Sequence, residues 1–145
     1  MTRILVPTNG SENTQKAGEY AITTAEISSD IILLYVIDTD YLGELSHADL
    51  RENLQKRLIK MGKGIINDFK KQIEDAKCQG HCKHVNLIPL IKEGKPEEVI
   101  LKTIEDENID KIIVSKSNKS TIEKYVIGSI TQKVAKKAKI PVEII

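Results

Sequence analysis

The chain has 145 residues, the size of one domain, and this is enough to bury about two-thirds of the surface that the unfolded chain exposes. Its 22 basic and 21 acidic residues nearly cancel to a net charge of +1, which argues against a nucleic-acid-binding module driven by bulk charge. Aromatic residues make up only 3% of the chain and there is no Trp, so stacking platforms for single-stranded nucleic acid are not expected.

We therefore expect a single domain over residues 1–145 that binds neither nucleic acid nor membrane. No signal peptide is expected, because the first three residues lead directly into an apolar run at 4–6 and then a turn. No apolar stretch approaches the ~20 residues that a membrane span needs. These features predict a cytoplasmic protein. In that compartment the two cysteines are expected to be reduced rather than bridged.

The first predicted elements are a strand, a turn and a helix. Residues 4–7 form a short apolar strand, and the Asn9-Gly10 pair that follows marks a sharp turn. Ser11 has the residue type of an N-cap for the next helix. Small residues at four-residue spacing let that helix lie close on a sheet, and they are Ala17, Ala21 and Ala25.

The next two elements are a buried strand and the longest helix of the chain. Residues 31–37 are almost all apolar, as in a parallel sheet that is covered on both faces. After a polar connection at 39–47, the longest predicted helix spans residues 48–77. We interpret its apolar stripe as core packing, with a coiled-coil partner or a membrane surface as the alternatives. The stripe has a helical period and consists of Leu50, Leu54, Leu58, Met61, Ile65, Phe69, Ile73 and Ala76.

Strands and helices continue to alternate in the second half. Residues 85–91 form a predicted strand that contains Pro89, and we place it at a sheet edge because proline cannot donate to a ladder. A helix is expected to open within residues 94–98, where Pro96 stands near the first helical position. The remaining predicted elements are a strand at 111–114, a helix at 129–139 and a final strand at 142–145, with Pro141 between the last two.

This order of elements, β-α-β-α-β-α-β-α-β, predicts an α/β fold. Right-handed crossovers make it an open, doubly wound, five-stranded parallel sheet with helices on both faces, as in Rossmann-like proteins. Ligands of such folds bind beyond the carboxyl ends of the strands, where the strand order reverses.

The segment from Val114 to Gln132 is the best candidate for a binding loop. It begins at the end of a predicted buried strand and ends at a predicted helix, where Ser129 and Gln132 have the spacing of a capping box. Gly128 leaves the backbone uncovered just before the helix, so an anion could approach the first unpaired N–H groups. The pattern indicates a phosphate cradle. On local sequence alone, a plain helix start is the alternative.

Five segments, in order and across almost the whole chain, resemble the universal stress protein family. The resemblance implies that family's fold, which is similar to the adenine nucleotide alpha hydrolases, with strand order 3-2-1-4-5. The matching segments are Ile4-Leu-Val-Pro-Thr8 with Gly10-Ser11-Glu12, Leu34-Tyr-Val-Ile-Asp38, Glu93-Gly94-Lys-Pro96, Asp110-Lys-Ile-Ile-Val114, and Gly128-Ser129 with Pro141-Val142.

The family's ATP-binding members share the pattern G-x2-G-x9-G-[ST] after the fourth strand, and this chain keeps half of it. Gly128 and Ser129 match, whereas Ser115 and Asn118 replace the first two glycines. Ser115 adds a side chain where the backbone would approach phosphate. Asn118 is the next best residue at positive φ. Asn9 stands where the ATP-binding members have aspartate, and it keeps a hydrogen-bonding amide.

If the site is kept, the resemblance implies an ATP or AMP site, with Mg²⁺ accompanying ATP. The base and ribose would lie against Pro7, Thr8, Asn9 and Val36. The sugar and phosphates would pass over Val114, Ser115 and Asn118, and the phosphates would be held by Gly128, Ser129, Ile130 and Thr131.

Both cysteines and two of the three histidines lie in one short segment. In principle, four N/S ligands at Cys78, His81, Cys82 and His84 could surround Zn²⁺, but their spacing fits no standard finger or knuckle. We expect a polar turn without metal, with a chelated metal or a redox-sensitive cysteine pair as the alternatives.

The sequence carries no common catalytic signature, so we expect a protein that is not an enzyme, apart from slow ATP hydrolysis. The first hypothesis is a regulatory protein of the stress response with a nucleotide site at the carboxyl ends of strands 1 and 4. The second is an interaction module of the same fold without nucleotide. A small ATPase or phosphotransfer enzyme is the third. The resemblance also implies a homodimer through antiparallel pairing of the last strand, which starts at Val142 and ends at Ile145.

Overall fold

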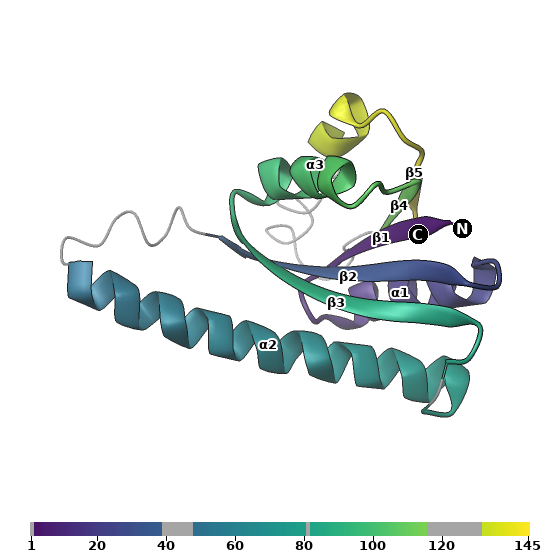
Figure 1. Cartoon of the computed structure of the whole chain (residues 1–145), viewed down its shortest axis with the longest axis horizontal. Helices are drawn as coiled ribbons and strands as arrows, with labels where there is room; N and C mark the ends of the chain where they lie inside the picture. Colours follow the sequence, from purple (N-terminus) through teal and green to yellow (C-terminus); the bar gives the residue numbers. More distant parts are fainter. Residues whose placement is uncertain (1, 39–47, 81, 116–131) are drawn as a thin grey trace.

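The computed structural model describes residues 2–38, 48–80, 82–115 and 132–145, and in these ranges it forms five strands with helices on both sides of the sheet (Figure 1). The strands are β1 (Arg3–Thr8), β2 (Ser29–Asp38), β3 (Val85–Gly94), β4 (Lys111–Val114) and β5 (Val142–Ile144). The labelled helices are α1 (Glu12–Thr24), α2 (Ala48–Cys78) and α3 (Pro96–Asp106), and residues 132–137 are also helical.

All neighbouring strands are parallel, and the sheet order is β3-β2-β1-β4-β5. The predicted fold and strand order are therefore confirmed. The chain builds outward from β1 to β3 and then returns to the other side of β1 with β4. The strand order thus reverses between β1 and β4.

Two apolar cores lie on the two faces of the sheet. On one face, Val6 and Leu33 pack with Ala17 of α1 and Phe69 of α2. On the other face, the core joins β1, β2 and β4 to α3 and to the helix at 132–137, and its members include Leu5, Ile32, Val99, Ile112 and Val134. Burial on both faces explains why β1 and β2 are nearly continuous apolar runs.

Helix α1 begins and packs as the sequence predicts. The Ser11 side chain accepts a hydrogen bond from the backbone N–H of Thr14, so Ser11 is the N-cap. Ala17 and Ala21 are completely buried. A Cβ at Gly18 would lie 3.2 Å from Ile73 Cδ1 of α2, so small residues set the close contact between these two helices.

The predicted stripe of α2 is confirmed in part: among the described side chains, two are buried, Leu54, Leu58 and Ile65 are half-buried, and two are exposed. Phe69 and Ile73 are buried as expected, but Ile66 rather than Ile65 continues the row, and Met61 is 61% exposed. Ala76 is exposed as well. The row shifts because Gly62 faces the sheet: a Cβ there would lie 3.2 Å from Tyr35 Cε1. The missing side chain lets α2 approach β2 through Gly62 and Ile66.

Helix α2 is 31 residues long, and Figure 1 shows that it extends well past the carboxyl end of β2. Its sequence contains several lysines. None of the helices in the described ranges combines the length and apolar character that crossing a membrane would require.

Strand β3 lies at the sheet edge, as its proline predicts. It pairs with β2 over its whole length, from Ser29↔Val85 to Asp38↔Gly94, with Pro89 opposite Leu33. It runs three residues further than the predicted 85–91. The additional residues, 92–94, belong to the strand because they continue its pairing with β2.

The amino ends of three strands are tied together by Arg3. Its guanidinium contacts the Asp30 carboxylate at 2.6 Å, the Glu107 carboxylate at 3.1 Å and the Glu107 carbonyl oxygen at 2.6 Å. The backbone N–H of Arg3 donates to Asp110 at 2.8 Å. Asp30 also accepts from the Asn86 amide on β3. Hydrogen bonds between charged groups are shorter and stronger than those between neutral groups, so these contacts hold the amino ends of the strands together.

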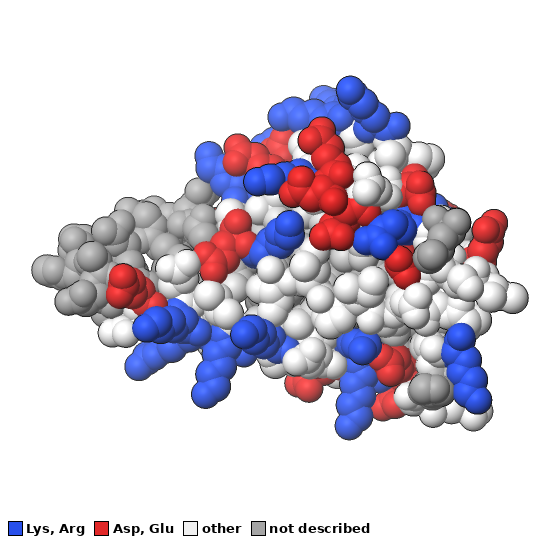
Figure 2. Space-filling view, in the orientation of Figure 1, with Lys and Arg blue, Asp and Glu red and all other residues white. Residues whose placement is uncertain are grey.

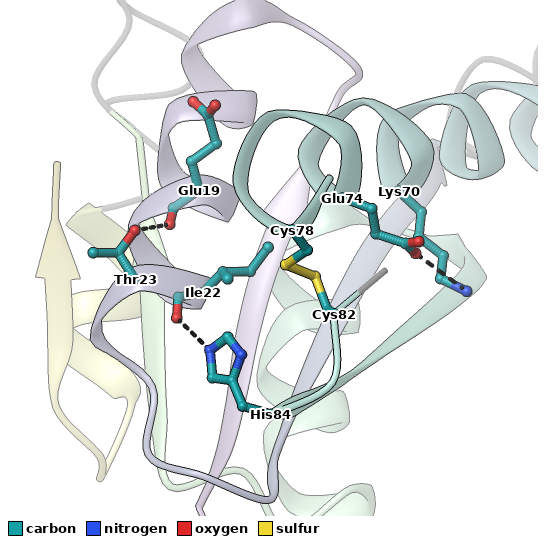
Figure 3. The surroundings of a disulfide bond; sticks show 8 residues. All are labelled: Glu19, Ile22, Thr23, Lys70, Glu74, Cys78, Cys82 and His84. Carbon is teal, nitrogen blue, oxygen red and sulfur yellow. Dashed lines mark hydrogen bonds and ion pairs between the residues drawn. A yellow bond between two sulfur atoms is a disulfide. The ribbon is translucent and has the colours of Figure 1, made fainter. Parts of the chain in front are cut away.

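Cys78 and Cys82 form a disulfide, so the expectation of two reduced cysteines is wrong (Figure 3). Helix α2 ends with Gln79 and Gly80 in left-handed conformations, and Gly80 N–H donates to the carbonyl of Glu74, which returns the chain toward the helix. That turn brings Cys82 back to Cys78. The sequence spacing alone did not reveal this, because it depends on how the helix ends.

The disulfide also bears on the metal alternative. Its two sulfurs are bonded to each other and are not thiolate ligands. His84 lies with Nε2 3.3 Å from the carbonyl oxygen of Ile22 on α1 (Figure 3), and His81 lies outside the described residues. No group of three or more potential metal ligands occurs in the described ranges.

Reduction of the disulfide should destabilise the protein measurably. Closing a loop of five residues stabilises a chain by about 2 kcal/mol in the chain-entropy model, so dithiothreitol should lower the unfolding free energy by roughly that amount. Urea denaturation with and without reductant would measure it. The Cys78→Ser/Cys82→Ser double variant is the control and should unfold identically in both conditions. Equal stability of the native protein with and without reductant would contradict the prediction.

Candidate functional site

The candidate site lies where the carboxyl ends of β1 and β4 meet. In the parallel ladder Leu5 pairs with Ile112, and Thr8 and Ser115 each follow three residues later. The end of β1 and the end of β4 therefore open onto the same edge of the sheet. This edge is also the point where the strand order reverses, which is where open α/β sheets form their ligand crevice.

The turn after β1 is held by a network of side-chain hydrogen bonds. Thr8 donates to the hydroxyl of Thr14 at 2.9 Å and accepts from the backbone N–H of Gly10 at 3.0 Å. Asn9 Oδ1 accepts from the backbone N–H of Ser11 at 3.0 Å and from Thr14 Oγ1 at 3.4 Å. The turn predicted from Asn9-Gly10 is thus an Asx turn followed directly by a helix N-cap.

Gly10 meets two constraints at once. Its φ is 82°, a conformation that side chains disfavour, and a Cβ there would lie 2.8 Å from Ile65 Cγ2 of α2. Helix α2 therefore packs directly on the turn that forms one side of the site. Ile65 and the buried Thr14 shape this turn. The helical stripe predicted Ile65 only as a core residue and not as a neighbour of the site, and Thr14 was not predicted. The Ser-x-x-Thr spacing at 11–14 was the available signal for Thr14.

The structure brings together the described residues of the predicted base and sugar region. Pro7 is half-buried and Thr8 is buried on β1, and Val114 and Ser115 are buried at the end of β4. Val36 lies half-buried on the neighbouring strand β2 and packs against the core on the α3 face. It also borders a hollow of about 340 Å³ between the end of β2 and residues Leu58 and Met61 of α2. The predicted phosphate-binding residues Asn118, Gly128, Ser129, Ile130 and Thr131 lie outside the described residues.

The helix at 132–137, which follows the candidate phosphate loop in sequence, is anchored to α3 by charges. Glu97 in the first turn of α3 contacts Lys137 at 2.9 Å and Lys133 at 3.6 Å. The hydrogen bond from Lys137, with the charge of Lys133, lowers the pKa of Glu97, and the same hydrogen bond raises the pKa of Lys137. These pairs join the helix at 132–137 to α3, beside the buried Val134 that packs into the core on the α3 face.

Comparisons of the amino-acid sequence with known proteins all point to one family. The model of a family described as the universal stress protein family matches residues 1–145. A universal stress protein of Methanothermobacter thermautotrophicus is 30% identical over 133 residues, which cover 91% of this chain and 86% of the relative. Universal stress protein MJ0577 of Methanocaldococcus jannaschii is 28% identical over 158 residues, which cover 99% of this chain and 93% of the relative.

Solved structures show the same similarity in three dimensions. The structure of MJ0577 superposes with a TM-score of 0.80 at 28% identity, covering 99% of this chain and 94% of that one. UspA of Lactobacillus plantarum gives 0.77 at 23% identity, with 99% and 97% covered. A family protein of Arabidopsis thaliana with AMP bound gives 0.66 at 18% identity, with 100% and 91% covered. At such low identities, the last two support the fold only.

The anchoring of the helix at 132–137 should depend on pH. Because the pKa of Glu97 is lower in the folded protein, its contribution to stability is present above its ordinary pKa and is lost as the pH falls through the lowered value. Glu97→Gln should therefore lower the melting temperature at about pH 7 and have little effect at about pH 3.

The matched control is Glu105→Gln, a change of the same kind at an exposed position on the same helix. It should have a small effect at both pH values. A Glu97→Gln effect that is the same at both pH values would mean that the lost interaction is not the ion pair.

Proposed function

Because the chain belongs to the universal stress protein family, we propose that it is a regulatory protein of the stress response that binds an adenine nucleotide, ATP or AMP. The observation that carries the proposal is the meeting of β1 and β4 at the reversal of strand order, with the hydrogen-bonded turn at Thr8 and Asn9 on one side and Ser115 on the other. Adenine nucleotides bind in this kind of crevice in doubly wound folds.

The described residues fit the base and ribose end of such a ligand. Pro7 and Val36 offer half-buried apolar surface on adjacent strands for a flat ring. Asn9 Oδ1 is engaged by Ser11 and Thr14, so its Nδ2 group turns away from the turn as a donor. A ring nitrogen of the base or a ribose hydroxyl can accept from it. An aspartate at the same position would offer an acceptor instead.

The phosphates would lie over Ser115 and Asn118 and be held by Gly128, Ser129, Ile130 and Thr131. The bare backbone N–H groups at a helix start suit phosphate oxygens. The Arabidopsis thaliana relative, whose structure has AMP bound, supports this class of ligand. ATP would bring Mg²⁺ with it. We do not propose that the protein hydrolyses the nucleotide, because the sequence has no common catalytic signature. We also propose that the protein is cytoplasmic.

A second function is favoured by the three departures from the ATP-binding pattern. Asn9, Ser115 and Asn118 each differ from the residue that the binding members carry. Ser115 is buried at the end of β4, so its side chain occupies space near the sugar and phosphates. A protein that has lost nucleotide would act as an interaction module of the same fold.

In either case we propose a homodimer formed by antiparallel pairing of the last strand, predicted at residues 142–145 and observed as β5 at Val142–Ile144. β5 lies at the edge of the sheet with Ile144 46% exposed. Its middle residue Glu143 accepts a hydrogen bond from the Tyr20 hydroxyl of α1 and lies 3.7 Å from Lys111 of β4. The hydrogen bond to Glu143 raises the pKa of Tyr20. These contacts hold the edge strand in place for a partner.

Nucleotide binding has a direct test. Freshly purified protein is denatured and the supernatant is chromatographed for ATP, ADP and AMP, and thermal unfolding is followed with and without Mg-ATP. We expect bound nucleotide or a stabilisation of about 2.7 kcal/mol when the ligand is present at about 100 times its Kd. An empty supernatant without any thermal shift would instead support the interaction module.

Two glycine substitutions make the test specific. Gly128→Ala adds a methyl group at the predicted phosphate approach and should weaken nucleotide binding by about tenfold or more, equivalent to about 1.4 kcal/mol. Gly64→Ala is the matched control, because Gly64 is exposed on α2 and a Cβ there meets nothing within 4 Å. Equal weakening by both variants would contradict the assigned site.

The dimer is tested by placing a charge on the free edge. Ile144→Lys should weaken dimerisation about tenfold or more, because a lysine on an edge strand blocks strand pairing. Sedimentation velocity would measure it. Ile27→Lys is the control, since Ile27 is 81% exposed in the turn between α1 and β2 and is not part of β5. A native protein that sediments as a monomer at micromolar concentration would overturn the proposal.

A further inference from the structure

The opposite edge of the sheet, formed by β3, is also open. In the part of the chain that the structure describes, β3 hydrogen-bonds only to β2. Its first seven residues, 85–91, carry no charge, and Ile88 is 37% exposed. Figure 2 shows this strand as a white band between the mainly basic border over α2 and the mixed charges over α3. An edge strand of this kind is a template for another strand.

Beside the carboxyl half of this edge lies a hollow of about 440 Å³. Helix α2, β3 and α3 each contribute one lysine to its lining, namely Lys63, Lys92 and Lys102. Each element also contributes one apolar side chain, namely Ile59, Ile91 and Val99. Three separate parts of the chain therefore converge on a space with apolar walls and a basic rim.

The charges of the hollow leave a positive excess. Among its described lining residues the one carboxylate is Glu93, which accepts a hydrogen bond from the Gln55 amide at 2.6 Å. Among the described residues, the ion-pair partner of Lys92 is Asp106, at the long distance of 3.9 Å. Lys63 and Lys102 are exposed, and neither forms an ion pair with another described residue. The hollow thus suits a ligand that carries carboxylates.

We propose that the carboxyl half of β3 receives an extended segment of a partner protein with two adjacent acidic residues, which adds to the sheet as a sixth strand. Successive side chains of a strand point to opposite faces. One acidic residue would meet Lys63 beside Ile59 on the α2 face, and the next would meet Lys102 beside Val99 on the α3 face. Backbone pairing gives such additions their affinity, and the side-chain positions give their specificity.

The sequence of β3 restricts where this pairing occurs. Pro89 has no N–H, and a proline in a sheet turns its nitrogen toward the unpaired side. It therefore removes an outward donor from the middle of the edge. The segment after Pro89, which includes Ile91 and Glu93, lies beside the hollow and keeps its donors. Pro89 also protects the long apolar edge from unselective pairing.

A second copy of this chain fits the edge less well. Antiparallel pairing of two β3 edges keeps the two copies of α2 on the same face of the joined sheet. When such pairing is centred beside the hollow, it brings the two copies of Lys63 to the same face across the seam, and like charges oppose each other. An acidic segment is complementary to the same lysines. Charge therefore favours a different partner.

The probe is a fluorescein-labelled peptide, Val-Glu-Glu-Val-Val, titrated with the full chain and followed by fluorescence anisotropy. Lys63→Ala and Lys102→Ala should each weaken binding roughly three- to tenfold. Lys16→Ala, at an exposed position on α1, is the control and should leave the affinity unchanged. A version of the peptide with N-methylated backbone keeps both charges but cannot pair as a strand, and it should lose binding.

Amide hydrogen exchange supplies a second measurement on the native protein. Peptide should increase protection of the amides of Ile91 and Glu93. Three results would each overturn the proposal: no binding of the peptide, equal binding of the N-methylated peptide, or the same loss in all three lysine variants. Protection of Ile91 and Glu93 that rises with protein concentration in the absence of peptide would show that a second copy occupies the edge, which also overturns it.

Discussion

The contacts of Arg3 join three parts of the chain at the amino end of the central strand. One guanidinium group binds Asp30 at the start of β2 and Glu107 just before β4, while the backbone of Arg3 donates to Asp110. The strands on both sides of β1 are thereby aligned at their first residues. Because the ladders are parallel, alignment at one end determines which residues meet at the other. The register that places Thr8 and Ser115 at the same edge of the sheet is thus supported by an ion-pair network at the opposite end of the strands.

Much of the fold follows from local sequence features, because the forces that decide it are local or repeat along an element. The apolar run of β2, the N-cap Ser11 and the edge proline Pro89 each predicted the observed structure. The α2 stripe failed where the contact depended on an absent side chain, since Gly62 faces Tyr35 and moves the buried row to Ile66. The disulfide was missed for a related reason. Whether Cys78 meets Cys82 depends on the left-handed end of the helix, and spacing alone does not report that conformation.

The position of the candidate site could also be predicted from the sequence, but the orientation of its side chains could not. Position at the carboxyl ends of β1 and β4 follows from topology, and Pro7, Thr8, Asn9, Val114 and Ser115 lie there as expected. What the sequence could not provide is the orientation of Asn9. Its oxygen closes the turn onto Ser11 and Thr14, so the chemistry that it offers a ligand is that of a donor. In the proposed nucleotide site, asparagine in place of aspartate would therefore reverse the hydrogen-bonding polarity of one contact.

The order of the strands places the two open edges, β3 and β5, at opposite ends of the sheet. A dimer joined through β5 is one continuous sheet of ten strands, and its two β3 edges lie at the far ends, roughly 45 Å apart at the usual spacing between strands. Such a particle is bivalent. A partner that carries two acidic segments on a linker long enough to span it would be held by avidity, because the second contact is intramolecular once the first has formed. Dimerisation and partner affinity would then be coupled without any change in conformation.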